Sequence, residues 1–181
     1  MDDIANPNGT GPNGTGPNGD NPNDLAADEQ RLAELATELA DSVVTALGPW
    51  VVRCVERLCM AWEGEFPPSV RDQAQAAGDL AAHEVGSKVR ALLTSDVDAQ
   101  RMNPLQILRA AASYPTAVLR SAGVPPVVRD AEAERQFPDD DYDLTPASFA
   151  DLDPAVHDFG IAWGAGKAHV VLARRRAEGR R

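Results

Sequence analysis

The feature that most constrains the fold of this chain is a set of apolar stripes that repeat at the spacing of an α-helix. In the first stripe, leucine and valine recur every three or four residues and so share one helix face: Leu32, Leu35, Leu39, Val43 and Leu47. No run of alternating apolar and polar residues marks a β-strand. Aromatic residues make up only 5% of the chain, which leaves Ala, Val and Leu for the core. The pattern therefore predicts an all-α fold.

Glycine and proline indicate where the predicted helices begin and end. Gly48-Pro49 predicts a break, with Pro49 in the first turn of the next helix. Pro115 predicts a kink or a split in a later helix, and Asp153-Pro154 predicts a capped helix start. With these boundaries the sequence predicts helices over 24–47, 50–63, 69–94, 104–123, 127–136, 146–152 and 154–176.

These helices fit an irregular helical bundle of four long helices plus short helices, with a disordered N-terminal tail. The tail, 1–23, repeats Gly, Pro and Asn and has too few apolar residues to form a core. Residues 24–176 form one predicted helical domain, and 177–181 form a basic end. The predicted helix over 69–94 has an inward stripe of mostly small residues, namely Val70, Ala74, Ala77, Ala81, Val85, Val89 and Leu92.

The charge of the chain is strongly negative and unevenly distributed. The net charge is -11. Residues 129–160 carry ten acids and two bases, whereas 161–181 carry six bases and one acid. Overall acidity opposes binding to nucleic acid and to anionic membrane surfaces. We therefore expect a protein partner rather than a nucleic acid or a membrane.

The two cysteines and the N-terminus point to the cytoplasm. Cys54 and Cys59 lie five residues apart on one predicted helix and point in different directions, so we expect reduced, buried thiols. The acidic start, Met1-Asp2-Asp3, does not resemble a secretory signal. No apolar run approaches the roughly 18–20 residues that span a bilayer.

No motif predicts a catalytic residue, a cofactor or a metal site. The segment Gly164-Ala165-Gly166-Lys167 lacks both the first Gly of a phosphate loop and the Ser or Thr that follows its Lys. Close helix packing is the interpretation we favour for these glycines, together with Gly160. His157 and His169 are not spaced as metal ligands on a helix. A small helical enzyme without a recognisable motif stays an alternative, and it would gather His157, Asp158 and Lys167 in a pocket.

The candidate site residues are charged or aromatic and lie in the last third of the chain. The interpretation we favour for the acidic loop over 137–145 is a solvated loop; the alternatives are a docking site for a basic partner or for the chain's own arginine-rich end, and a Ca²⁺ or Mg²⁺ site. An exposed tryptophan would indicate a binding surface. The predicted partner-binding residues are Asp139, Asp140, Asp141, Tyr142, Asp143, Trp163, Arg174, Arg175 and Arg176.

The leading functional hypothesis is a non-enzymatic interaction or adaptor protein. It depends on the absence of catalytic motifs and on the separation of acidic and basic segments. The alternative is a nucleic-acid-associated protein that uses the arginine-rich C-terminus. The segment over 50–63 is apolar nearly all round, so it predicts either the most buried helix or the interface of a homodimer.

Three segments of the chain resemble a group of short, uncharacterised proteins from GC-rich actinobacteria. They are 114–130, which contains Val124-Pro125-Pro126, 137–154, which contains Phe137-Pro138-Asp139-Asp140, and Trp163-Gly164-Ala165-Gly166-Lys167-Ala168-His169. The resemblance covers about 40–176 and excludes the tail. It implies a bacterial, cytosolic origin and carries over no functional residue.

Overall fold

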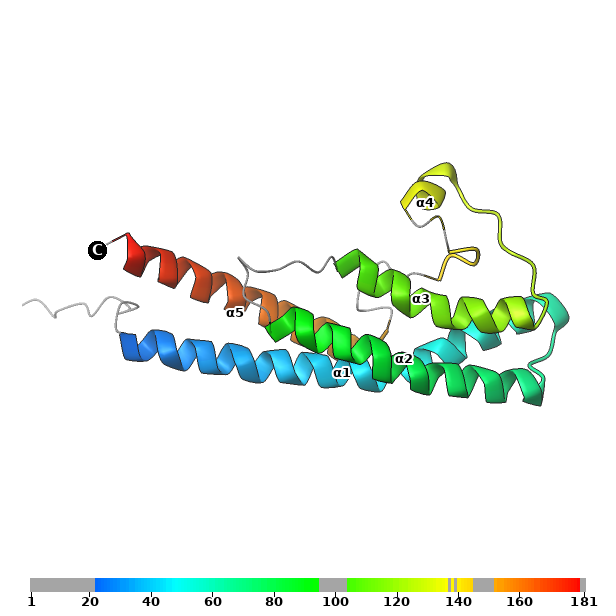
Figure 1. Ribbon diagram of the computed structural model, residues 1–181, viewed down its shortest axis with the longest axis horizontal. Coiled ribbons are helices and arrows are strands. Elements are labelled where there is room, and N and C mark those ends of the chain that lie inside the picture. Colours follow the sequence, from blue (N-terminus) through cyan, green and yellow to red (C-terminus); the bar gives the residue numbers. More distant parts are fainter. Residues whose placement is uncertain (1–21, 95–103, 137, 139, 145–151, 180–181) are drawn as a thin grey trace, which may run out of the picture.

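A computed structural model of the chain describes residues 22–94, 104–136, 138, 140–144 and 152–179. These residues form four long helices and one short helix, and no strand occurs among them. The predicted all-α class is therefore confirmed. The helices are α1 (Pro22–Glu63), α2 (Pro68–Thr94), α3 (Pro104–Ser121), α4 (Ala131–Gln136) and α5 (Pro154–Glu178). The long helices lie along one axis and give an elongated bundle (Figure 1).

Helix α1 is one continuous helix of 42 residues, so the predicted break at Gly48-Pro49 is wrong. Proline lacks the N–H that would bond to the carbonyl four residues earlier, but this loss is outweighed by packing on both sides. Leu47, Trp50 and Val51 are all buried, and Gly48 has no Cβ to clash with the proline ring. At about 1.5 Å per residue, α1 is about 63 Å long and spans the bundle.

Helices α1 and α2 approach each other closely at two glycines of α2. The two helices run antiparallel, joined by a turn in which Gly64 adopts a positive φ of 75°. A Cβ added at Gly78 of α2 would lie 2.8 Å from the carbonyl oxygen of Gly48 in α1. One added at Gly86 would lie 2.5 Å from Cγ2 of Val44. Glycine is therefore needed where the two backbones cross.

The core runs along the α1–α2 interface and extends to α3 and the start of α5. The predicted α2 stripe is confirmed at Ala74, Ala81, Val85, Val89 and Leu92, which are buried, whereas Val70 and Ala77 are partly buried. Leu119 of α3 and Val156 of α5 are also fully buried in this core. Small side chains thus let the helices pack closely.

Helix α3 contacts both α1 and α2, and α5 contacts α1. Pro115 is buried within α3, which continues through it rather than splitting. Asp153 caps α5 as predicted, because its carboxylate accepts a hydrogen bond from the N–H of Ala155 at 2.7 Å. Arg53 of α1 donates to the carbonyl oxygen of Leu152 at 3.0 Å and holds the start of α5 against the middle of α1.

Helix α4 is shorter than the predicted helix over 127–136. Asp130 accepts hydrogen bonds from the N–H groups of Glu132 and Ala133 and therefore begins the helix at Ala131. The N–H of Val127 instead donates to the carbonyl oxygen of Asp141 at 3.0 Å. A long-range backbone contact thus replaces the first predicted turn.

Other predicted boundaries lie at the edge of the described residues or beyond it. Helix α1 begins at Pro22, so the last two residues of the predicted tail over 1–23 belong to it. The rest of that tail and nearly all of the predicted helix over 146–152 lie outside the described residues. Helix α5 extends to Glu178, two residues past its predicted end. Across the described part of the chain, none of the helices is both long enough and apolar enough to span a bilayer.

The crossing of α1 and α2 gives a test of the packing. We expect Gly78→Ala to lower the free energy of unfolding by about 1–3 kcal/mol, since the new Cβ meets backbone atoms that have no rotamer to change. Chemical denaturation followed by circular dichroism measures the change. Gly160→Ala is the matched control, because its Cβ would meet nothing within 4 Å, and we expect it to stabilise the helix by up to about 1 kcal/mol. Equal stabilities of the two variants would contradict the close contact.

Candidate functional site

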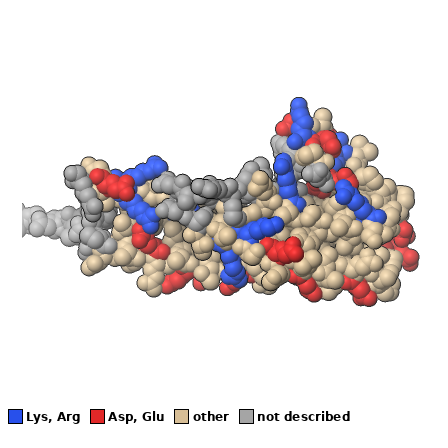
Figure 2. Space-filling view, viewed as in Figure 1, with Lys and Arg blue, Asp and Glu red and all other residues tan. Residues whose placement is uncertain are grey.

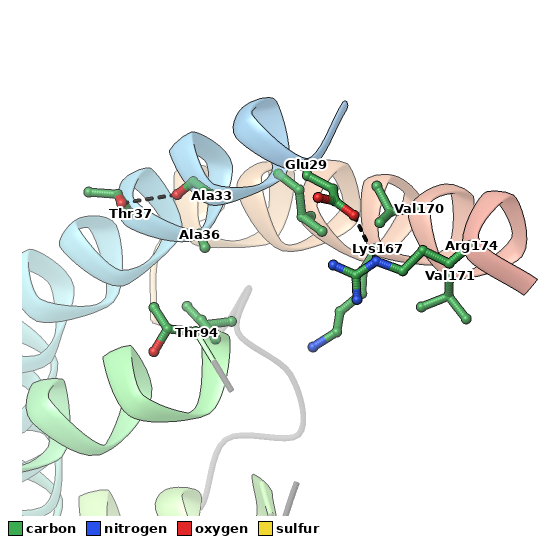
Figure 3. A pocket seen from close by; sticks show the side chains of 11 residues that line it. Glu29, Ala33, Ala36, Thr37, Thr94, Lys167, Val170, Val171 and Arg174 are labelled. Carbon is green, nitrogen blue, oxygen red and sulfur yellow. Dashed lines mark hydrogen bonds and ion pairs between the residues drawn. The ribbon is translucent and has the colours of Figure 1, made fainter. Parts of the chain in front are cut away.

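A cleft with a cavity volume of about 390 Å³ lies between the first turns of α1 and the last turns of α5 (Figure 3). The end of α2 closes one side of it. Its lining combines small and branched apolar side chains with three charged ones: Glu29, Leu32, Ala33, Ala36, Thr37, Leu93, Thr94, Lys167, Val170, Val171 and Arg174. A volume of this size is in the range that ligand-binding pockets occupy.

Two helical stripes form the walls of the cleft. The α1 residues follow one another at spacings of three and one, and the α5 residues at positions 167, 170, 171 and 174 do the same. This spacing places each set on one face of its helix. Since α5 begins beside Arg53 and ends beside Glu29, the two helices run antiparallel and their faces meet along the cleft.

Two polar contacts between α1 and α5 hold the rim of the cleft. Arg174 donates from Nε to the carboxylate of Glu29 at 2.7 Å, and Nε2 of His169 lies 3.1 Å from a carboxylate oxygen of Asp28. Both pairs are partly exposed, so each adds at most about 1 kcal/mol to stability. Their main effect is to orient the C-terminal half of α5 along the start of α1.

Lys167 is the cation that extends into the cleft (Figure 3). Its ammonium nitrogen lies 4.7 Å from the centre of the Trp163 ring, one helical turn earlier, which is a cation–π contact. It forms no ion pair within the described residues. Its charge therefore stays available for a ligand that enters the cleft.

Two predicted site residues of the acidic segment, Asp140 and Tyr142, are buried and stabilise the chain's own backbone. Asp140 is buried, and its carboxylate accepts hydrogen bonds from the N–H groups of Tyr142 at 3.3 Å and Leu144 at 2.8 Å. Tyr142 is buried and donates its hydroxyl to the carbonyl oxygen of Val124 at 2.7 Å. Neither side chain is therefore exposed to a partner.

The remaining acids of that segment differ in their surroundings. Asp141 accepts from Nε of Arg120 at 2.7 Å, so its partner within the chain is α3 and not the arginine-rich end. Asp143 is exposed and adopts a positive φ of 55°. Asp139 lies outside the described residues. Figure 2 shows basic and acidic side chains side by side around α4 rather than a patch of one sign.

The three tryptophans have three different environments. Trp50 is buried in the core, whereas Trp62 is 57% exposed at the end of α1. Trp163 is partly buried against the core, and its indole Nε1 is buried without a hydrogen-bond partner among the described residues. Trp163 therefore packs as an anchor for α5, and Trp62 is the exposed one of the three.

Sequence reasoning missed Lys167 as a site residue. It was considered only as part of a failed phosphate-loop motif and, under the enzyme alternative, in a pocket with His157 and Asp158. The usable signal is its position four residues after Trp163, because this spacing places an ammonium group over an indole ring on one helix face. Of the predicted arginines, Arg174 lines the cleft, while Arg175 and Arg176 are exposed in the last turn of α5.

The cysteines and histidines do not add a reactive centre to the cleft. Cys54 and Cys59 are buried and free, and burial raises the pKa of the Cys54 thiol to about 11. His157 and Asp158, which the enzyme alternative would gather with Lys167, are exposed and do not line the cleft. Within the described residues, no group of three or more His, Cys, Asp or Glu side chains is arranged to hold a metal ion.

The chain matches no known protein family, no curated protein and no solved structure. The cleft and the exposed helix faces are therefore the basis for any functional argument.

The two tyrosines of the chain give a test of the packing beside the acidic segment. Burial, with a hydrogen bond to Glu84 and its charge, raises the pKa of Tyr114 to about 12, and burial with the charge of Asp141 raises the pKa of Tyr142. Above about pH 10 the folded protein therefore keeps protons that the unfolded chain loses. Stability is fully present below that pH and is lost as pH rises through the folded pKa values.

Absorbance of the phenolate groups measures both transitions. We expect both tyrosines of the folded protein to ionise later than those of the unfolded chain. In Tyr114→Phe, the transition near pH 12 should disappear while the Tyr142 transition stays. Ionisation of both phenols at about pH 10 in the folded protein would contradict the burial and hydrogen bonding described above.

Proposed function

We propose that this protein is a non-enzymatic adaptor that binds an acidic amphipathic helix of a partner protein in the cleft between α1 and α5. The observation that supports the proposal is the combination of an apolar floor with the ammonium group of Lys167, which forms no ion pair with any residue that the structure describes. An apolar surface alone would accept many occupants. The charge selects a partner that carries carboxylates beside its apolar side chains.

The shape of the cleft fits a helical partner. Helix-binding grooves take anchors spaced at i, i+3, i+4 and i+7, and the cleft walls carry the same spacing along two antiparallel helices. Leu32, Leu93 and Val171, all partly exposed, supply the apolar contact area from three different elements. A third helix laid along this cleft would complete a local bundle in the way that helices usually pack.

The electrostatics favour an acidic partner although the chain as a whole is acidic. The cleft lies against the basic half of α5, where residues 161–181 carry six bases and one acid. Arg174 faces the cleft while paired with Glu29, so a partner carboxylate near that pair would meet two cations and one anion. The remaining acidic surface also repels an acidic partner, so the electrostatic field directs the partner toward this end of the bundle.

The setting we propose is the bacterial cytoplasm. Two buried thiols with a raised pKa are chemically inert and suit a reducing compartment.

Selection from a library of displayed helical peptides on the immobilised full-length protein tests the proposal. We expect enrichment of peptides with leucine or valine at helical spacing and Asp or Glu between them. The affinity of an enriched peptide, followed by fluorescence anisotropy, should fall at least about tenfold in Lys167→Glu. Ala33→Trp, at an exposed position of the cleft wall, should fill the cleft and also weaken binding.

The matched control is Lys88→Glu, which makes the same charge change at an exposed position of α2, away from the cleft. Lys88 and Lys167 are the two lysines of the chain. We expect Lys88→Glu to leave the affinity unchanged. Selection without acidic peptides, or an equal loss in the two lysine variants, would refute the proposal. Binding of labelled duplex DNA that depends on Lys167 would favour the nucleic-acid alternative instead.

A further inference from the structure

Helix α5 is apolar on two opposite faces, and the chain itself covers only one of them. The inner face packs against α1 and the core through Val156, Trp163 and Val170. The outer face carries Ile161, Ala165, Ala168 and Leu172, all of them exposed. Ile161 is 60% and Leu172 is 52% exposed, although both are large aliphatic side chains. An ordinary surface helix has one apolar face, so the second face indicates a contact outside the chain.

The outer face has the spacing of a heptad repeat. The four apolar residues follow one another at intervals of four, three and four, which is the pattern of a seam between two helices. The same intervals place Asp158 three residues before Ile161 and Arg175 three residues after Leu172. Both charged residues are exposed. The seam therefore has an acidic end and a basic end.

We propose that the outer face of α5 binds the same face of a second copy of this chain, with the two helices antiparallel. A two-fold axis between residues 166 and 167 pairs Ile161 with Leu172 of the second copy and Ala165 with Ala168. The same register pairs Asp158 with Arg175 at both ends of the interface. One residue set is thus complementary to itself, as an isologous dimer requires.

The charges select this arrangement over a parallel one. In a parallel pair Asp158 would face Asp158 and Arg175 would face Arg175, and both contacts are repulsive.

The small residues of the seam allow the two helices to pack closely. Ala165 and Ala168 are central in the seam, and a Cβ added at the neighbouring Gly164 would meet nothing within 4 Å in the single chain. The two helix axes can therefore approach closely at the centre.

The proposed dimer is independent of the proposed adaptor function. The cleft residues Lys167, Val170 and Arg174 lie on the side of α5 opposite to the seam, so a dimer leaves both clefts open. The segment over 50–63, which the sequence offered as a dimer interface, is a weaker candidate. Val51, Val55 and Cys59 are buried within the chain's own core, so most of its apolar area is already used.

Sedimentation equilibrium of the full-length protein over a concentration series tests the proposal. We expect a concentration-dependent monomer–dimer equilibrium that Leu172→Glu abolishes. Asp158→Arg and Arg175→Asp should each weaken the dimer by at least about tenfold, because each places like charges opposite one another. The double variant carrying both changes restores the opposite-charge pairs and should recover the dimer.

Mixing the two single charge variants gives a second measurement. Each variant alone should dimerise at least about tenfold more weakly than the wild type, whereas the mixture should form a heterodimer, since one copy then carries two basic ends and the other two acidic ends. Circular dichroism of each variant is the control for folding, and we expect unchanged spectra because the substituted positions are exposed. A wild-type protein that stays monomeric at the highest concentration would overturn the proposal. A dimer that persists unchanged in Leu172→Glu and in the charge variants would overturn it as well.

Discussion

The structure depends most on the close contact between α1 and α2 at Gly48 and Gly78. Each glycine presents bare backbone to the other, with no room for a Cβ at position 78. This contact sets the separation of the two longest helices, and the small residues of α2 then fill the narrow interface. Helix α3 packs on this pair and α5 packs on α1. The contact also explains why α1 continues through Pro49, because buried residues on both sides of the proline hold the helix in place.

The cleft is a consequence of unequal helix lengths. Helix α1 has 42 residues and α2 has 27, so only the last turn of α2, with Leu93 and Thr94, reaches the start of α1. Beyond that turn, α1 and α5 run side by side, held by Glu29–Arg174 and Asp28–His169. The side of these two helices that α2 would otherwise cover stays open as the cleft, whose apolar side chains are flanked by Glu29, Lys167 and Arg174. A partner helix bound in the cleft would take the place that a longer α2 would occupy. This is the geometric reason for proposing a helix as the occupant.

Helix α5 connects the two proposals. Its inner face anchors it to α1, and its C-terminal half lines the cleft with Lys167 and Arg174. Its outer face remains exposed with Ile161 and Leu172 at heptad spacing. The inner side of α5 is covered by the chain except where it borders the cleft, and the outer face is exposed along its length. The cleft side and the outer face of α5 are the physical basis of the proposed adaptor function and of the proposed dimer, respectively.

The sequence by itself determined the helical class, the inward stripe of α2 and the Asp153 cap of α5, because each depends on residues within a few turns of one another. Only the tertiary structure decided that α1 is continuous, that Asp140 and Tyr142 support the backbone, and that Lys167 faces a cleft. Of the site residues that the sequence predicted, the structure places Arg174 in the wall of the cleft and Trp163 in contact with Lys167. The reason is physical: periodicity and capping are local, whereas burial and pairing depend on residues far apart in sequence, with separations of 99 positions between Arg53 and Leu152 and 145 between Glu29 and Arg174.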